Sequence, residues 1–372
     1  MFEFLRLAHP SLGPQPIRPP RLSLRVPLTD RIGLPLPLLA YDLPWSTVDS
    51  ERAARVADAL DELGIAVAAL GCELGTRPSQ PATAQASPAA AVALSNRFCP
   101  YRPERYGLRI EDLTAAKVID IRLAASRDGS GRFNYSPAQM RRWDLRGARK
   151  ADRNESLDVS TPTMHWPPDV RTLEELPGKV AELRQLAPAA AIGISLGLDS
   201  LELGLPIVRD AKAEILTIRA DDDLQRDATT ANGGSSTAHL SAARSLANCV
   251  ARTRRWLDAH GGRQIRLIVV PPSEADAGDC VKLLALGAAV VAVDGWCKPL
   301  LAPRPPEAND DWAAATLGVS TRPAAPATPE VDTAELQSRI ERMIALVEST
   351  GVASLSELGP EHVREWGRAS SE

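Results

Sequence analysis

The sequence predicts an α/β fold in which a parallel β-sheet closes into a barrel. Short segments that are almost wholly apolar alternate with segments of helical periodicity, as in a parallel sheet that is buried on both faces. Seven such apolar segments can be counted, and a length of 372 residues suits one (β/α)8 barrel with extensions at its ends. An open, doubly wound sheet stays open as a second architecture, because alternating elements do not fix the topology.

The expected elements follow from the spacing of apolar residues. Strands are expected in the seven apolar segments 35–43, 65–70, 118–125, 190–197, 213–220, 265–270 and 288–295. Helices are expected where apolar residues recur with helical spacing, namely in 46–64, 110–117, 173–187, 203–212, 237–261, 274–287 and 333–350. Three pairs have capping-box spacing and mark expected helix starts: Ser46 with Asp49, Thr172 with Glu175, and Ser273 with Asp276.

Composition divides the chain into four parts. Residues 1–34 are rich in proline and arginine and are expected to form an irregular lead-in. The barrel is expected over 35–301, followed by a proline-rich connector at 302–330 and a helical tail at 331–372. Inside the barrel, polar or low-complexity stretches at 75–96, 127–162 and 221–236 are expected to be surface loops.

Charge and composition restrict the expected partners and location. The formal net charge of -4 gives no basic field, which disfavours a nucleic-acid partner. The sequence has no run of about 20 apolar residues and no signal-like start, so neither a membrane span nor secretion is expected. We therefore expect a cytoplasmic protein whose partner is a small-molecule substrate or another subunit.

The five cysteines do not have the spacing of a metal site. None of them forms a C-x-x-C pair, and no zinc or iron–sulfur spacing is present. Buried, reduced thiols are the expected state, because free cysteine is among the most buried residue types.

Several stretches of the chain occur in a familiar order. They are AKVIDIRLAASRDGSG, the segment DVRTLEEL from Asp169 to Leu176, AEILTIRADDD, and LLALGA downstream of Asp279. In order and spacing, residues 35–294 resemble the FMN-binding barrel domain of the glutamate synthase family, in its ferredoxin-dependent and archaeal forms. The resemblance implies a TIM barrel, an FMN cofactor, and the reductive amination of 2-oxoglutarate to glutamate.

The resemblance also implies a set of cofactor-binding positions. Arg122 stands where the family has a strand lysine, and Arg127 lies near a second lysine in the following loop. Ser195 replaces another family lysine. Ser46 lies in the segment before the first helix, and Gly295 follows the last barrel strand. No catalytic residue is assigned.

Other positions depart from the family pattern. The family has two glycines after the seventh strand, but this chain has Pro271-Pro272, which have no N–H groups to donate to a phosphate. Glu274 and Asp276 follow, and their charge opposes a bound anion at the next helix start. The family's three-cysteine cluster is represented by Cys297 alone, so an iron–sulfur cluster is not expected.

These departures leave two other functions open. The first is a non-catalytic barrel that has lost its FMN and iron–sulfur sites and acts as a binding or scaffold subunit. The second is an enzyme for another ligand, held by Arg122, Arg127 and the acidic run Asp221–Asp223, whose carboxylates suit a magnesium ion. Such a run is more often a solvated loop. The stretch NGGSS at 232–236 has the composition of an anion nest or of a helix cap.

Overall fold

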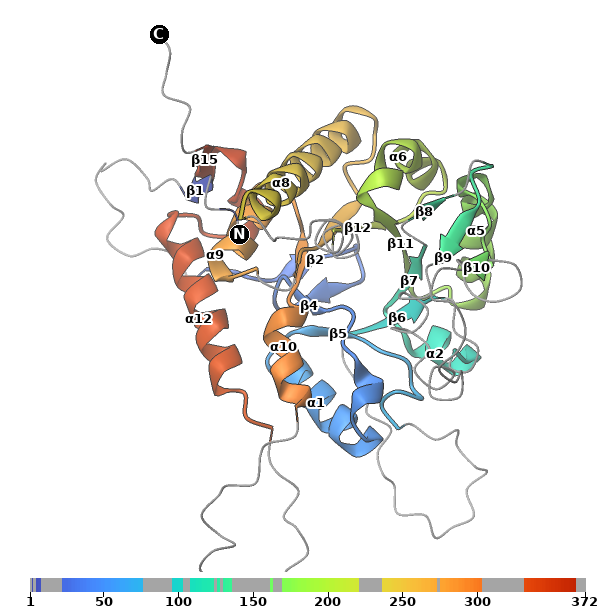
Figure 1. Ribbon diagram of the computed structural model, residues 1–372, viewed down its shortest axis with the longest axis horizontal. Coiled ribbons are helices and arrows are strands. Elements are labelled where there is room, and N and C mark those ends of the chain that lie inside the picture. Colours follow the sequence, from blue (N-terminus) through green and yellow to red (C-terminus); the bar gives the residue numbers. More distant parts are fainter. Residues whose placement is uncertain are drawn as a thin grey trace, which may run out of the picture.

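The computed structural model describes most of the chain. The described residues are Phe2 and 5–7, 22–75, 96–102, 108–123, 126–127, 130–135, 161–162, 169–220, 236–272, 275–302 and 331–365. Eight parallel strands form a closed barrel in the order β11-β12-β13-β14-β4-β5-β6-β7 (Figure 1). The predicted (β/α)8 barrel is therefore confirmed, and the open doubly wound sheet is excluded.

The eight barrel strands are short and lie in parallel register. The ring closes where β14 pairs with β4, with Val291 opposite Leu38 and Ala292 opposite Leu39. In chain order the strands are β4 Leu38–Ala40, β5 Ala66–Ala68, β6 Arg97–Tyr101, β7 Val118–Arg122, β11 Ala191–Gly197, β12 Ile215–Arg219, β13 Arg266–Val270 and β14 Val290–Ala292.

Helices surround the barrel on its outer side (Figure 1). A 3-10 turn, η2 Leu173–Glu175, leads directly into α5. The helices between and after the strands are α1 Ser50–Glu62, α2 Ile110–Ala115, α5 Leu176–Leu186, α6 Leu201–Asp210, α8 Ser236–Ala259, α9 Ala277–Ala285 and α10 Asp294–Leu301.

Strand β6 is the barrel strand that the sequence pattern does not reveal. Its sequence, RFCPY, contains an arginine and a proline, and proline cannot donate a ladder hydrogen bond. Arg97 is nevertheless buried, because its Nε donates to the carbonyl oxygen of Ala69 at 3.0 Å and its guanidinium pairs with Asp112. The Arg97 charge is therefore compensated within the fold. The pattern of apolar residues in the sequence does not indicate this strand.

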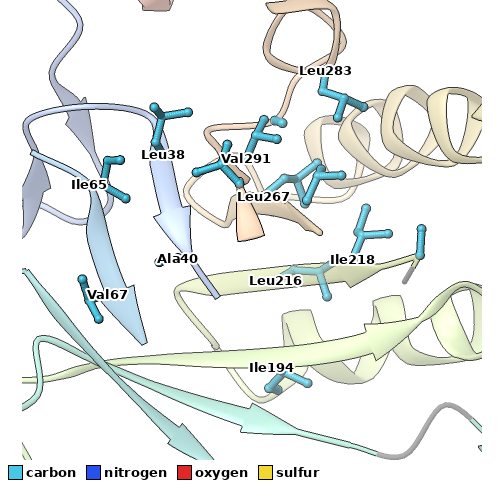
Figure 2. Close-up of a cluster of buried hydrophobic side chains, with 14 of the residues drawn as sticks. Leu38, Ala40, Ile65, Val67, Ile194, Leu216, Ile218, Leu267, Leu283 and Val291 are labelled. Atoms are coloured by element: carbon cyan, nitrogen blue, oxygen red, sulfur yellow. The ribbon is translucent and has the colours of Figure 1, made fainter. Parts of the chain in front are cut away.

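Alternate residues of the barrel strands face two different apolar clusters. One set points outward and packs beneath the helices, where Leu38, Val67, Ile194, Leu216 and Val291 lie together (Figure 2). The other set points into the barrel. Its members include Leu39, Ala66, Phe98, Val118, Ala191, Ile215, Ile268 and Val290. This period of two is what parallel strands covered on both faces require.

A hairpin closes the amino end of the barrel. Strand β2 Val26–Pro27 pairs with β3 Gly33–Leu34, inside the segment expected to be an irregular lead-in. The hairpin side chains Leu28 and Leu34 belong to the same buried cluster as Val118, the first residue of β7. The hairpin therefore fills the amino end of the barrel. The open end, or mouth, of the barrel lies at the carboxyl ends of the strands.

The expected tail helix is confirmed as α12 Ala334–Ser349, which packs on α9 outside the barrel (Figure 1). Beyond it, β15 Val363–Glu365 pairs antiparallel with β1 Leu5–Leu7. The two terminal segments are therefore joined by a small sheet. The connector at 302–330 lies almost entirely outside the described residues, and the four-part division of the chain stays a prediction.

Neither of the two expected capping boxes whose residues are described is formed. Helix α1 begins after Asp49, whose carboxylate accepts from the backbone N of Arg52 at 2.8 Å, and Ser46 lies in the preceding 3-10 turn η1 Trp45–Thr47. The Glu175 carboxylate accepts from the backbone N of Arg171, so it does not complete a box with Thr172.

The box before α9 is displaced in the same way. Asp276 caps α9 together with Asp279, and each carboxylate accepts from the other residue's backbone N. Ser273, the expected partner, lies outside the described residues. For α1 and α9 the capping residue lies about one turn later than expected, because several Ser, Thr, Asp and Glu residues precede each helix and the pattern does not decide between them.

The expected loop over 127–162 contains a small sheet. Strand β9 Phe133–Tyr135 pairs antiparallel with β8 Ser126–Arg127 on one side and with β10 Thr161–Pro162 on the other. The side chain of Phe133 is fully buried, which a polar surface loop does not predict. This sheet follows β7 in the chain, so it starts from the carboxyl-end mouth.

The described part of the chain contains neither a membrane-spanning helix nor a cluster of metal ligands. No helix there has both the length and the apolar character needed to cross a membrane. Within the same residues, no three His, Cys, Asp or Glu side chains are grouped so that they could hold a metal ion. The acidic run Asp221–Asp223 lies outside this part of the chain, so the magnesium alternative stays a prediction.

Candidate functional site

On β7 and β12 the interior of the barrel becomes polar toward the carboxyl ends of the strands, whereas the amino-end positions are apolar. On β7 the inward positions run from Val118 through Asp120 to Arg122 along the strand. On β12 they run from Ile215 through Thr217 to Arg219. Because side chains alternate along a strand, the inward positions of these two strands are apolar at the amino end and polar from the middle of the strand onward. Active sites of such barrels lie at this end.

Arg122 lies at the centre of this layer and is fully buried. Its Nε donates to Oδ2 of Asp120 at 3.0 Å, and one terminal nitrogen donates to Oδ1 of Asp42 at 3.2 Å. The other terminal nitrogen donates to the carbonyl oxygen of Tyr41 at 2.6 Å. The guanidinium carbon also lies 3.8 Å from the centroid of the Tyr41 ring. Two carboxylates and an aromatic face thus compensate the cost of burying this charge.

Asp120 connects the arginine to a set of hydroxyl groups. Its Oδ1 accepts from Ser195 Oγ at 2.7 Å and lies 3.5 Å from Thr217 Oγ1. The Ser195 hydroxyl in turn lies 2.8 Å from the Tyr41 hydroxyl. The result is a continuous hydrogen-bonded cluster contributed by the ends of β4, β7, β11 and β12.

A line of alternating charges links this cluster to the turn after β5. Arg102, beyond the end of β6, pairs with Glu73, and its other terminal nitrogen lies 3.9 Å from Oδ1 of Asp42. Asp42 then contacts Arg122. The sequence of charges is therefore acid, base, acid, base, acid from Glu73 to Asp120. Each charge has an opposite neighbour, as a buried ionic network requires.

Burial keeps the Tyr41 phenol neutral. Desolvation raises the pKa of Tyr41 well above its usual value, although the nearby Arg122 acts in the opposite direction. Burial likewise raises the pKa of the Cys297 thiol, with a further contribution from the charge of Asp294. Tyr41 can therefore serve as a hydrogen-bond donor at neutral pH, and Cys297 is held as a thiol, which is a weak nucleophile and a weak metal ligand.

Replacement of Tyr41 by phenylalanine measures the hydroxyl contribution to this cluster. We expect Tyr41→Phe to lower the free energy of unfolding by about 0.5–1.5 kcal/mol, because one buried hydrogen bond is lost while Ser195 keeps its bond to Asp120. Urea denaturation of both proteins measures the difference. An unchanged or higher stability of the variant would show that the hydroxyl contact between Tyr41 and Ser195 contributes nothing.

The structure brings two of the five expected cofactor residues together. Arg122 and Ser195 are both fully buried and are bridged by Asp120. Gly295 is the second residue of α10 and is half-buried. Ser46 lies in η1 and Arg127 in β8, but their side chains are outside the described set. The role of all five in cofactor binding stays a prediction.

Several members of the cluster were missed from sequence. Tyr41 and Asp42 lie near the end of an apolar run, where a polar residue reads as a strand end, and Thr217 is a single polar residue inside β12. Asp120 gave the best available signal, because a carboxylate in the middle of the apolar strand VIDIR is costly to bury without a partner.

Comparisons with known proteins show the fold and leave the activity open. No protein-family model and no curated protein matches this sequence. Among solved structures, a variant of flavocytochrome b2 with sulfite bound is similar at 13% identity and a TM-score of 0.50, over 97% of this chain and 76% of that chain. The recombinant flavin-binding domain of baker's yeast flavocytochrome b2 is similar at 13% identity and a TM-score of 0.48, with the same coverage. The chain therefore shares its barrel fold with flavocytochrome b2.

The described residues at the ends of β13 and β14 do not fit the phosphate of a flavin nucleotide, although this is where such barrels often bind phosphate. Pro271 and Pro272 follow β13 and have no N–H groups. After β14, the carboxylate of Asp294 occupies the first position of α10. The backbone N–H groups of Trp296 and Cys297 donate to the carbonyl oxygen of Val293. No reaction step through a flavin is therefore derived from this corner.

Proposed function

We propose that this protein is an oxidoreductase of the FMN-dependent barrel class, with its site at the carboxyl-end mouth of the barrel. The fold shared with flavocytochrome b2 supports the class, and the sequence resemblance supports FMN as the cofactor. Because the corner at the ends of β13 and β14 does not fit a phosphate, this proposal requires that the FMN phosphate is held by groups elsewhere in the mouth.

The polarity of the carboxyl-end layer is the observation that carries the proposal. Interiors of these barrels are dominated by bulky aliphatic side chains. Here Asp120, Arg122 and Thr217 stand at interior positions and are almost wholly buried. Replacing a buried ion pair by well-packed apolar residues is often neutral or stabilising, so packing alone does not require these residues. Polar groups that lie at the carboxyl end of a barrel and contribute little to the stability of the protein are typical of an active site.

The finer proposal concerns the reaction. The resemblance to the glutamate synthase barrel favours reductive amination of 2-oxoglutarate by ammonia. Atom balance requires two electrons and two protons for each glutamate formed from 2-oxoglutarate and ammonium, with release of one water. The buried Arg122, paired with Asp120 and Asp42, supplies a fixed charge distribution at this mouth.

An assay with the full chain tests the finer proposal. The protein is incubated with FMN, reduced anaerobically with dithionite, and then supplied with 2-oxoglutarate and ammonium. We expect glutamate to form and the reduced flavin to be reoxidised in equal amounts, above a control of free FMN. Reoxidation with a different 2-oxo acid, and none with 2-oxoglutarate, would keep the class and exclude this substrate.

A non-catalytic barrel is the second candidate, and one observation favours it. Arg122 is fully buried, and each of its guanidinium nitrogens has a hydrogen-bond acceptor. An arginine held in this way fills the centre of the barrel and is bonded to groups of the protein rather than to a ligand. Absence of both flavin binding and turnover would favour this function over the first.

A further inference from the structure

The corner where the barrel closes, between the ends of β14 and β4, carries an internal anion. Oδ1 of Asp294 accepts from the backbone N of Tyr41 at 2.6 Å. Both carboxylate oxygens also accept from the backbone N of Asp42, at 3.1 Å for Oδ1 and 3.0 Å for Oδ2. One carboxylate thus accepts from two successive N–H groups that lie more than 250 residues earlier in the chain.

These donors have the arrangement of an anion site. Two successive backbone N–H groups that point at one place form a small anion-binding concavity. The first turn of α10 adds the positive end of a helix dipole, since Asp294 is its first residue. A ligand phosphate would use the same two kinds of group, namely free backbone N–H donors and a helix start.

We infer that Asp294 takes the position of a bound anion and determines which ligands the mouth accepts. Its carboxylate uses the N–H donors of Tyr41 and Asp42 and places a negative charge where a phosphate would need a positive one. On the neighbouring strand, Pro271 and Pro272 supply no donors in compensation. The mouth therefore excludes phosphate from this corner and takes ligands whose part facing Asp294 is neutral or cationic. The inference relies on the proposed function only for placing the site at this mouth.

The inference predicts that removing the carboxylate creates an anion site. In Asp294→Ala the N–H groups of Tyr41 and Asp42 lose their acceptor. The melting temperature is expected to fall by about 3–10 °C, because two charge-assisted hydrogen bonds are lost at once. Added sodium formate, whose carboxylate can occupy the vacated place, should restore much of this loss in a saturable manner. Inorganic phosphate should act in the same way.

Matched controls separate site binding from general salt effects. Sodium chloride at equal ionic strength gives the baseline for each protein. Asp49→Ala removes another carboxylate that accepts from a backbone N, at the exposed start of α1, where water replaces it. This variant should lose stability without rescue by formate. At equal concentrations, formate and phosphate should stabilise the wild-type protein less than they stabilise Asp294→Ala.

The outcomes are distinct and do not require flavin. Rescue of Asp294→Ala alone, by formate and phosphate, supports the inference even if the protein binds no FMN. Equal responses of Asp294→Ala and Asp49→Ala to formate would overturn it. If Asp294→Ala does not fold, Asp294→Asn, which removes the negative charge, replaces it. Phosphate stabilisation of this variant no greater than that of the wild type would then overturn the inference.

Discussion

Arg122→Ala is expected to lower the free energy of unfolding by about 3–5 kcal/mol, because it removes one partner of a fully buried ion-pair cluster. The carboxylates of Asp120 and Asp42 would remain inside the barrel without their central cation. The aromatic face of Tyr41 would also lose its cationic partner. Urea denaturation followed by circular dichroism measures the change.

A matched arginine and a compensated variant complete this experiment. Arg252 pairs with Glu202 on the surface, where both side chains are mostly exposed, so Arg252→Ala should cost at most about 1 kcal/mol. The double variant Arg122→Met with Asp120→Leu removes the charged pair together and should be more stable than Arg122→Ala. If Arg122→Ala cost no more than Arg252→Ala, the account of a compensated central charge would be wrong.

Leu34→Ala is expected to cost about 2–5 kcal/mol, the range for truncating a fully buried leucine. Leu34 belongs to the hairpin that closes the amino end of the barrel, and its side chain lies in the same buried cluster as Val118 and Ala191. Truncation would leave a cavity beneath the barrel. Thermal and urea denaturation of the variant check the prediction.

The control for this prediction is an exposed leucine. Leu203 on α6 is 61% exposed, so Leu203→Ala should change the stability by no more than about 0.5 kcal/mol. A small effect at Leu34, comparable with that at Leu203, would mean that the hairpin does not close the barrel in solution and that the lead-in is as irregular as its composition indicates.

The barrel could be predicted because most of its strands obey one simple rule. The segments around Ile194, Leu216 and Leu267 are apolar at nearly every position, as strands buried on both faces must be. Strand β6 escaped because Arg97 and Pro100 interrupt its apolar run. The charge of Arg97 is compensated by Asp112, on the helix that follows β6 in the chain, and no local sequence pattern indicates such a partner.

The candidate site was harder to predict, because it depends on closure of the ring. Ser195 and Arg122 were singled out, but only through resemblance to a family. The contact of Tyr41 with Ser195 spans 154 residues, and that of Tyr41 with Asp294 spans 253. Contacts of this range follow from the position of each strand in the barrel, which periodicity does not give. The carboxylate of Asp120 was the one local signal in this cluster, because a buried carboxylate requires hydrogen-bond donors or an opposite charge beside it.

The most direct test of the proposed function is a flavin titration of the purified full-length protein. FMN is added in steps, and its visible absorption and fluorescence are recorded until no further change occurs. The account predicts a saturating shift of the flavin bands with one FMN per chain, and a rise in melting temperature at the same ratio. Free-flavin spectra throughout, with no thermal stabilisation, would contradict the FMN-dependent class and leave the non-catalytic barrel as the function to pursue.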